Sequence, residues 1–163
     1  MSEQRAFQDD YPDDFNHCYG CGQLNPEGLR IRTYWDGETT LTRYTPRACH
    51  TAIPGYVYGG LIASLIDCHG TASAAAAACR RDGRPMDASP RQRFVTASLK
   101  VDYLRPTPLG PELELRGRIT DLGRRRITVE VELSAAGRVT ARGTVVAAAL
   151  PENWGRGGTH RKD

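Results

Sequence analysis

An aspartate in the middle of the one long apolar helix that the sequence predicts is the residue best placed for chemistry. Residues 59–80 carry apolar side chains at three- and four-residue steps, which predicts a helix with an apolar stripe. Small or polar residues share another face of this helix: Gly60, Ser64, Asp67, Thr71 and Ala74. A carboxylate is costly to bury without a partner. Asp67 therefore either faces solvent or a local hydrogen-bond donor, or is held at a cleft as an acid, base or nucleophile.

Two glycines open this helix. The first N–H groups of a helix have no partner within it and carry partial positive charge. Because glycine lets a carbonyl oxygen come close, Gly59 and Gly60 could stabilise an oxyanion in acyl transfer, although such a pair is also common as a simple turn. Asp67 lies about two turns away, roughly 10 Å along the axis. We therefore expect a carbonyl at these glycines to meet the Asp67 of a partner subunit.

The elements around the helix predict an antiparallel sheet. Asp36-Gly37 is a type I′ turn signal between two strand-like runs, and Gly123 and Ala136-Gly137 separate later ones. The predicted strands are residues 29–34, 39–44, 94–104, 112–120, 126–134 and 138–150. One long helix against such a sheet is an α+β layer, and the element order favours the hot-dog arrangement. A sheet wrapped around one helix leaves open edges, which a dimer would pair.

Length and composition predict a single globular domain. The 163 residues are 39% hydrophobic and 25% charged, with a net charge of +3, which is too weakly basic to predict nucleic-acid binding. We expect a loose segment over residues 1–15, a hot-dog domain over residues 16–150 and a flexible tail over residues 151–163. No stretch has the uninterrupted apolar length of a membrane span, and the acidic N-terminus does not resemble a signal peptide, so we expect a cytoplasmic protein.

The stretch from Tyr56 to Asp67 resembles the hot-dog acyl-CoA thioesterases of the PaaI-like and THEM-like groups. Their signature is a His-Gly-Gly, a short apolar run, and an acid nine residues after the histidine. The resemblance extends to further segments on both sides: Cys18-Tyr19-Gly20-Cys21-Gly22, Asn25-Pro26, Gly28-Leu29, His50 before Pro54-Gly55, Thr96-Ala97-Ser98-Leu99, and Tyr103-Leu104-Arg105-Pro106.

The resemblance implies hydrolysis of a small or medium acyl-CoA without metal or other cofactor, by a homodimer or a dimer of dimers. It implies that Asp67 activates water or attacks directly, that Thr96 holds the water, and that Gly59 and Gly60 form the oxyanion segment. Tyr58 stands where the family histidine should be. A non-catalytic acyl-CoA or small-ligand binding protein therefore remains an alternative, as does another enzyme on the same fold, such as a hydratase.

Several residues could bind the substrate around this centre. Tyr58 offers a neutral O–H donor, and His50 and Ser64 could line the same pocket. Arg91 and Arg93 belong to an arginine-rich loop that could hold the phosphates of CoA or could simply be solvated. In the alternating pattern of residues 94–104, Thr96 lies on the side of the polar residues and not on the apolar side that the helix should cover. It therefore reaches the site only if the strand begins at a cleft or bulges there.

The five cysteines are expected to be free thiols. Cys18-x-x-Cys21 is the spacing of half a metal site, and Cys49-His50 is the plausible second half nearby. We favour buried thiols in a packed loop and expect no metal. Adjacent helical residues point apart, which excludes a catalytic pair of Cys68 and His69 and makes His69 a core or interface residue.

Overall fold

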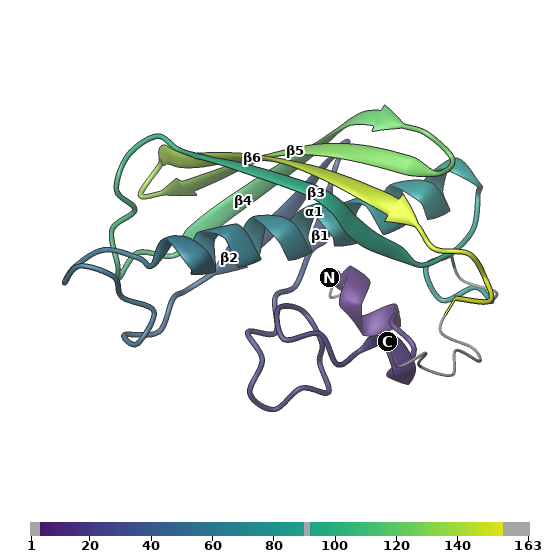
Figure 1. Ribbon diagram of the computed structural model, residues 1–163, viewed down its shortest axis with the longest axis horizontal. Helices are drawn as coiled ribbons and strands as arrows, with labels where there is room; N and C mark the ends of the chain where they lie inside the picture. Colours follow the sequence, from purple (N-terminus) through teal and green to yellow (C-terminus); the bar gives the residue numbers. More distant parts are fainter. Residues whose placement is uncertain (1–3, 90–91, 155–163) are drawn as a thin grey trace, which may run out of the picture.

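One long helix lies along one face of a six-stranded antiparallel sheet (Figure 1). The computed structural model describes residues 4–89 and 92–154. Its strands follow the order β1-β2-β4-β5-β6-β3 across the sheet. In chain order the elements are η1 (Phe7–Asp10), η2 (Asp13–Phe15), β1 (Tyr34–Asp36), β2 (Thr39–Tyr44), α1 (Gly59–Arg81), β3 (Phe94–Tyr103), β4 (Leu113–Leu122), β5 (Arg126–Ala135) and β6 (Arg138–Ala149). The predicted hot-dog architecture is confirmed.

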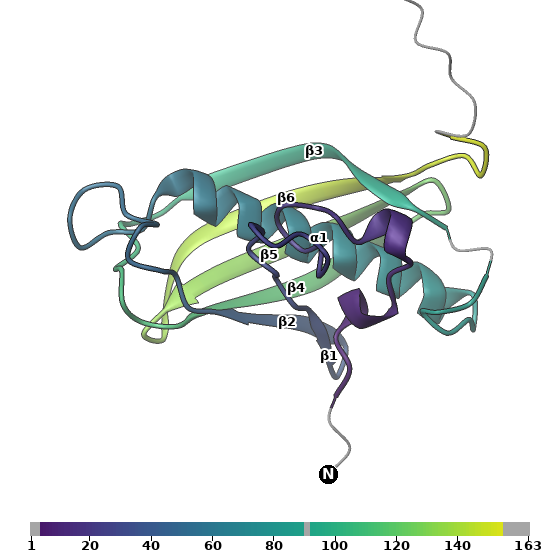
Figure 2. The same cartoon turned by 90° about the horizontal axis from the view of Figure 1, so that it is seen from below.

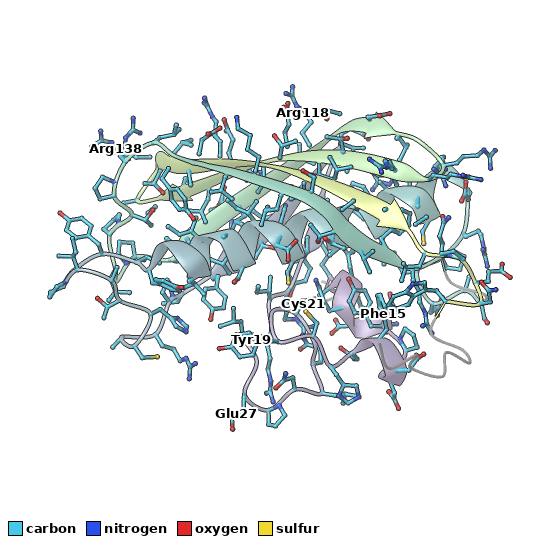
Figure 3. The ribbon with its side chains drawn as sticks, viewed as in Figure 1. Phe15, Tyr19, Cys21, Glu27, Arg118 and Arg138 are labelled. Carbon is cyan, nitrogen blue, oxygen red and sulfur yellow. The ribbon has the colours of Figure 1, made fainter. Side chains whose placement is uncertain are left out.

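The two faces of the sheet differ as the alternation of the sequence predicts. Side chains on the inner face are buried against α1, among them Leu115, Val129, Val131, Leu133 and Val145. The outer face carries ion pairs across neighbouring strands, including Arg118–Glu130 and Arg142–Glu132. Figure 3 shows Arg118 pointing away from the helix. Burial of this apolar inner face is the main source of stability, at about 25 cal/mol per Å² removed from water.

A third layer covers the side of α1 that faces away from the sheet. The segment before β1 crosses under the helix (Figure 2) and buries Phe7, Gln8 and Ile31. The expectation of a loose segment over residues 1–15 is therefore wrong for residues 4–15, which form two short 3-10 helices. The buried amide of Gln8 explains the packing, because its Oε1 accepts a hydrogen bond from the backbone N–H of Thr33. Residues 155–163 of the predicted tail lie outside the described residues.

The first predicted strand is displaced along the chain. The sequence predicts residues 29–34, whereas β1 runs from Tyr34 to Asp36. Arg30 has a φ of +55°, which breaks the extended conformation. The backbone of this stretch bonds instead to the loop before it, with Leu29 N–H donating to Tyr19 and Ile31 N–H to Gly20. Leu29 and Ile31 are buried, but the backbone partner of this stretch is a loop and not the sheet.

The helix α1 is apolar enough for a bilayer but is enclosed by protein. Its length and a mean hydropathy of 1.2 meet the composition of a membrane span, and 72% of that stretch is buried inside the fold. Leu65, Ile66 and His69 are fully buried. The sheet and the segment before β1 together account for this burial, so its apolar character is that of a core helix.

We predict that Gly70→Ala lowers the free energy of unfolding by ~1–3 kcal/mol because of overpacking. A Cβ at Gly70 would lie 2.5–2.6 Å from carbons of Val145 on β6. At an unobstructed helix position, Gly→Ala raises the free energy of unfolding by about 1 kcal/mol. The sign of the change therefore tests the close packing. Urea unfolding measures it, and combining the change with Val145→Ala should cost less than the sum of the two single changes. A more stable Gly70→Ala protein would contradict the close packing.

Candidate active site

Only one stripe of α1 remains partly open between the sheet and the segment beneath it. Its half-buried residues recur at three- and four-residue steps: Gly60, Ala63, Ser64, Asp67, Thr71, Ala75 and Cys79. Asp67 lies at the centre of this stripe. The small-residue face predicted from the sequence is thus confirmed as the open face, except that Ala74 is fully buried and Ala75 takes its place.

Asp67 is held by a chain of two hydroxyl groups that joins α1 to β3. The Thr96 hydroxyl donates to Asp67 Oδ1 over 2.5 Å. The Thr71 and Thr96 hydroxyl oxygens are 3.0 Å apart. Because a hydroxyl has only one hydrogen, the Thr71 hydroxyl must donate to Thr96. The chain Thr71 to Thr96 to Asp67 fixes the orientation of the carboxylate and leaves Oδ2 to accept another hydrogen bond.

A β-bulge turns Thr96 toward the helix. The pairing of β3 with β6 shifts between Thr96 and Ser98, so Ala97 is an extra residue in the strand. Before the bulge, Phe94 and Thr96 are opposite Ala149 and Ala147, on the inner side of the sheet. After it, Leu99, Val101 and Tyr103 take over the inner side. The alternation of the sequence alone would place Thr96 on the outer face, and the bulge turns it to the inner face. The bulge is therefore what brings Thr96 to Asp67.

The environment of Asp67 makes its carboxylate a stronger base than an exposed one. Partial burial raises its pKa, while the hydrogen bond from Thr96 lowers it and the nearby Cys18 raises it, and the net change is upward. A carboxylate with a raised pKa is better suited to accept a proton from water. This geometry and basicity fit the predicted role of Asp67.

The start of α1 forms a second part of the open face. Among the described residues, the N–H groups of Gly59 and Gly60 donate to no backbone carbonyl. The Tyr58 ring packs against Gly60 so closely that a Cβ there would lie 2.4 Å from it, and the Tyr103 hydroxyl donates to the Gly59 carbonyl over 2.7 Å. Two tyrosines thus surround free donor groups at the helix N-terminus, which is a suitable site for a carbonyl oxygen.

His50 and Ser64 occupy different parts of this region. The His50 carbonyl accepts a hydrogen bond from Tyr58 N–H over 2.9 Å, which places the two residues side by side. His50 Nδ1 accepts from the backbone N–H of Arg47, so Nε2 carries the proton when the ring is neutral. The Ser64 hydroxyl donates to the Gly60 carbonyl one turn before it. Its hydrogen is therefore already used within the helix.

Of the two arginines predicted to bind phosphate, the structure describes Arg93 alone, and Arg93 is engaged elsewhere. Arg91 lies outside the described residues. Arg93 pairs with Asp14, and its guanidinium lies 5.4 Å from the centre of the Phe15 ring. Arg93 therefore fastens the segment before β1 to the start of β3.

His69 is a core residue, as predicted. It is fully buried, with Nδ1 2.8 Å from the Thr42 hydroxyl and Nε2 3.0 Å from the Thr40 hydroxyl. Burial lowers its pKa to about 3, so the ring is neutral near pH 7. Its hydrogen bonds join α1 to β2 and leave it no part in the open face.

Sequence reasoning missed three features of this region. Thr71 was seen only as a small residue, and its contact with Thr96 depends on the bulge. A small cavity beside Thr71 includes residues from the segment before β1; its lining is Tyr11, Phe15, Thr71, Ala75, Cys79, Met86, Gln92 and Phe94. The third feature is a cluster of Cys18, Cys21 and Cys68, in which Cys68, and neither Cys49 nor His50, joins the Cys-x-x-Cys pair. All five cysteines are free, as expected.

Comparison with known proteins agrees with this architecture. The family model described as "Thioesterase superfamily" matches residues 54–147. That match includes α1, β3 and the whole Asp67–Thr96 contact. None of the curated proteins matches the chain.

Solved structures include several similar folds. A thioesterase superfamily protein from Shewanella loihica is 49% identical, with a TM-score of 0.65, and the match covers 86% of this chain and 100% of that one. A Haemophilus influenzae thioesterase is 13% identical, with a TM-score of 0.66 and coverage of 90% and 96%. The Escherichia coli PaaI protein of the phenylacetic acid degradation operon is 16% identical, with a TM-score of 0.61 and coverage of 76% and 81%. The last two show likeness of fold alone.

We predict that deleting Val95 lowers the free energy of unfolding by about 2–4 kcal/mol, whereas deleting Ala97 costs less. Without Val95, Phe94 turns to the outer face and leaves the core, at a cost comparable to truncating a buried aromatic residue. Without Ala97, the pairing of Thr96 with Ala147 and of Ser98 with Val146 becomes continuous, so Phe94 and Thr96 keep the inner face. Urea unfolding measures both losses. Equal losses in the two deletion variants would show that Ala97 is not the extra residue of the strand.

Proposed function

Because the chain belongs to the thioesterase superfamily, we propose that it hydrolyses the thioester bond of a small or medium acyl-CoA, with Asp67 as the catalytic carboxylate. The observation that carries the proposal is the hydrogen-bonded Asp67–Thr96–Thr71 chain on the only open stripe of the core helix. A long apolar helix has no structural need for a carboxylate at this position. Two threonines on different elements nevertheless hold it in one orientation.

The proposed reaction uses this orientation directly. Asp67 Oδ2 accepts a proton from a water molecule as the water oxygen attacks the thioester carbonyl carbon. The carbonyl oxygen becomes an oxyanion, which the N–H groups of Gly59 and Gly60 stabilise. Its collapse breaks the carbon–sulfur bond and releases CoA thiolate, which takes up the proton from Asp67. No step in this sequence calls for a metal ion or another cofactor.

The proposed active site contains residues from two subunits. Gly59 and Asp67 of one chain are about two helical turns apart, roughly 10 Å, which is too far for one thioester to contact both. β3 is an edge strand with exposed apolar side chains, among them Val95, Leu99 and Tyr103, and it borders the open stripe of α1. Pairing of two β3 edges would cover these side chains and bring Asp67 of one subunit toward the glycines of the other.

The binding residues follow from the same geometry. Tyr58 stands against Gly60 and takes the place of the family histidine, so its hydroxyl is the proposed donor to the substrate carbonyl, with His50 beside it. The cavity beside Thr71 is narrow, which favours a short acyl group or one that displaces Met86. Arg93 already pairs with Asp14, so a CoA phosphate would have to share the Arg93 guanidinium with that carboxylate. Arg91, outside the described residues, stays a predicted phosphate ligand.

A binding protein without turnover is the second candidate. The observation in its favour is the Tyr58 ring itself, which packs against Gly60 at the position where the family has a histidine. Release of thiol from a panel of acyl-CoA esters separates the two. If no ester is cleaved but CoA esters raise the melting temperature, the binding role replaces the catalytic one.

We predict that Asp67→Asn lowers kcat/KM for the best acyl-CoA by ~10²–10⁴-fold, the range for loss of a general base. The amide is isosteric and still accepts the Thr96 hydrogen bond, so the melting temperature should change little. Thiol release measured with a chromogenic disulfide reports the rate. Asp82→Asn, at the exposed C-terminal end of α1, is the matched control. Equal rates in the two variants would remove Asp67 from the mechanism.

We predict that Leu99→Arg gives a monomer with at least about 100-fold lower thioesterase activity, because two charges would meet at the centre of the paired β3 edges. Light scattering after size-exclusion chromatography gives the mass. Leu122→Arg, at the exposed end of β4, is the control for adding charge to an exposed leucine. Full activity of a monomeric Leu99→Arg protein would contradict a site shared between subunits.

A further inference from the structure

Three cysteine sulfurs converge beside the open face of α1. Cys18 and Cys21 come from the loop before β1 and Cys68 from the middle of the helix, directly after Asp67. All three Sγ atoms lie within 4.8 Å of one another, and Cys18 and Cys68 are 3.9 Å apart. Figure 3 shows Cys21 in the loop that lies against the helix. Sulfurs of a tetrahedral zinc site with bonds of 2.3 Å are about 3.8 Å apart, so the Cys18–Cys68 distance is that of a metal site and the third sulfur is close enough to join it.

The loop that carries two of the sulfurs has the form of a chelating turn. The Gly22 N–H donates to the Cys18 carbonyl over 2.8 Å, which closes the turn around Cys18-Tyr19-Gly20-Cys21. Such a turn presents the Cys18 and Cys21 side chains from one short segment, which is the Cys-x-x-Cys ligand spacing found in many zinc sites.

Close contacts hold the turn against the helix in this arrangement. A Cβ at Gly20 would lie 2.2 Å from the Cys68 sulfur, so only glycine lets the loop come this near to α1. The Asn16 side chain accepts a hydrogen bond from Gln23 N–H, and Leu29 N–H donates to the Tyr19 carbonyl. The three sulfurs are therefore brought together by the protein fold itself.

Core packing and disulfide formation each explain the cysteine cluster less well than metal binding does. Thiols that only fill space need not converge, yet a loop and a helix bring the sulfurs of Cys18, Cys21 and Cys68 to one point. A Cys-x-x-Cys redox pair begins a helix in the thioredoxin type of site, whereas this pair lies in a non-helical turn. All three thiols are free, and a disulfide between any two would leave the third without a function in the cluster.

We propose that Cys18, Cys21 and Cys68 bind one zinc ion, which fastens the loop of residues 18–22 to α1 next to Asp67. Zn²⁺ binds thiolates strongly and takes four ligands in a tetrahedron, so three thiolates leave the fourth position to a water molecule. Binding releases the thiol protons, so the affinity falls at acid pH. This inference does not rest on thioester hydrolysis, and its test does not use that activity.

The test measures metal in the purified full-length chain. Protein produced in zinc-supplemented medium and dialysed against zinc-free buffer should retain one zinc per chain. The reduced apoprotein, titrated with Co²⁺, should develop thiolate-to-cobalt charge-transfer absorption. Cys18→Ser and Cys21→Ser should each weaken zinc binding by at least about 100-fold. Cys49→Ser, which removes an exposed cysteine outside the cluster, should bind as the wild type does.

A second measurement on the wild-type chain keeps the test decisive if a variant fails to fold. Zinc should protect Cys18, Cys21 and Cys68 from alkylation, read by peptide mass spectrometry, and should leave Cys49 reactive. Absence of both zinc and the cobalt absorption in fully reduced protein would overturn the proposal. So would full zinc binding by folded Cys18→Ser and Cys21→Ser proteins, or a native mass that reveals a disulfide within the cluster.

Discussion

The hydrogen bond from Thr96 to Asp67 is the contact on which the open face of this protein depends. It joins the core helix to the edge strand of the sheet, and it exists only because an extra residue, Ala97, turns Thr96 inward. Thr71 completes the chain from the next turn of the helix. A half-buried carboxylate is costly without such donors. The two threonine hydroxyls thus supply the hydrogen bonds that a half-buried carboxylate needs. They also hold the Asp67 carboxylate in one orientation, as a base requires.

The enclosure of α1 explains why the chemistry is confined to one stripe. The sheet covers one side of the helix, and the segment before β1 covers the other, so most of its circumference is buried. What stays open runs from the glycines at the helix start to Asp67 and Thr71. The exposed edge of β3 borders that stripe, so a second copy of the chain at this edge would also complete the site. Assembly and catalysis are therefore linked in the proposed function.

Much of this was predictable from the sequence, because the strong signals are local. The helix, the edge strand and the turns at Asp36-Gly37 and Ala136-Gly137 follow from apolar periodicity and turn residues. The acid at position 67 follows from its place among small residues. The bulge at Ala97 does not, because it depends on pairing with β6. Nor does the approach of Cys68 to Cys18 and Cys21, which depends on how a loop packs across 50 residues of chain.

The central claim is that one thioester contacts the helix start of one subunit and Asp67 of the other. A crystal structure with a non-hydrolysable acyl-CoA analogue tests it most directly. The account predicts a dimer paired through β3, with the analogue's carbonyl oxygen hydrogen-bonded to the Gly59 and Gly60 amides and the partner's carboxylate one water away from its carbonyl carbon. An analogue bound with its carbonyl remote from every Asp67 would contradict the account.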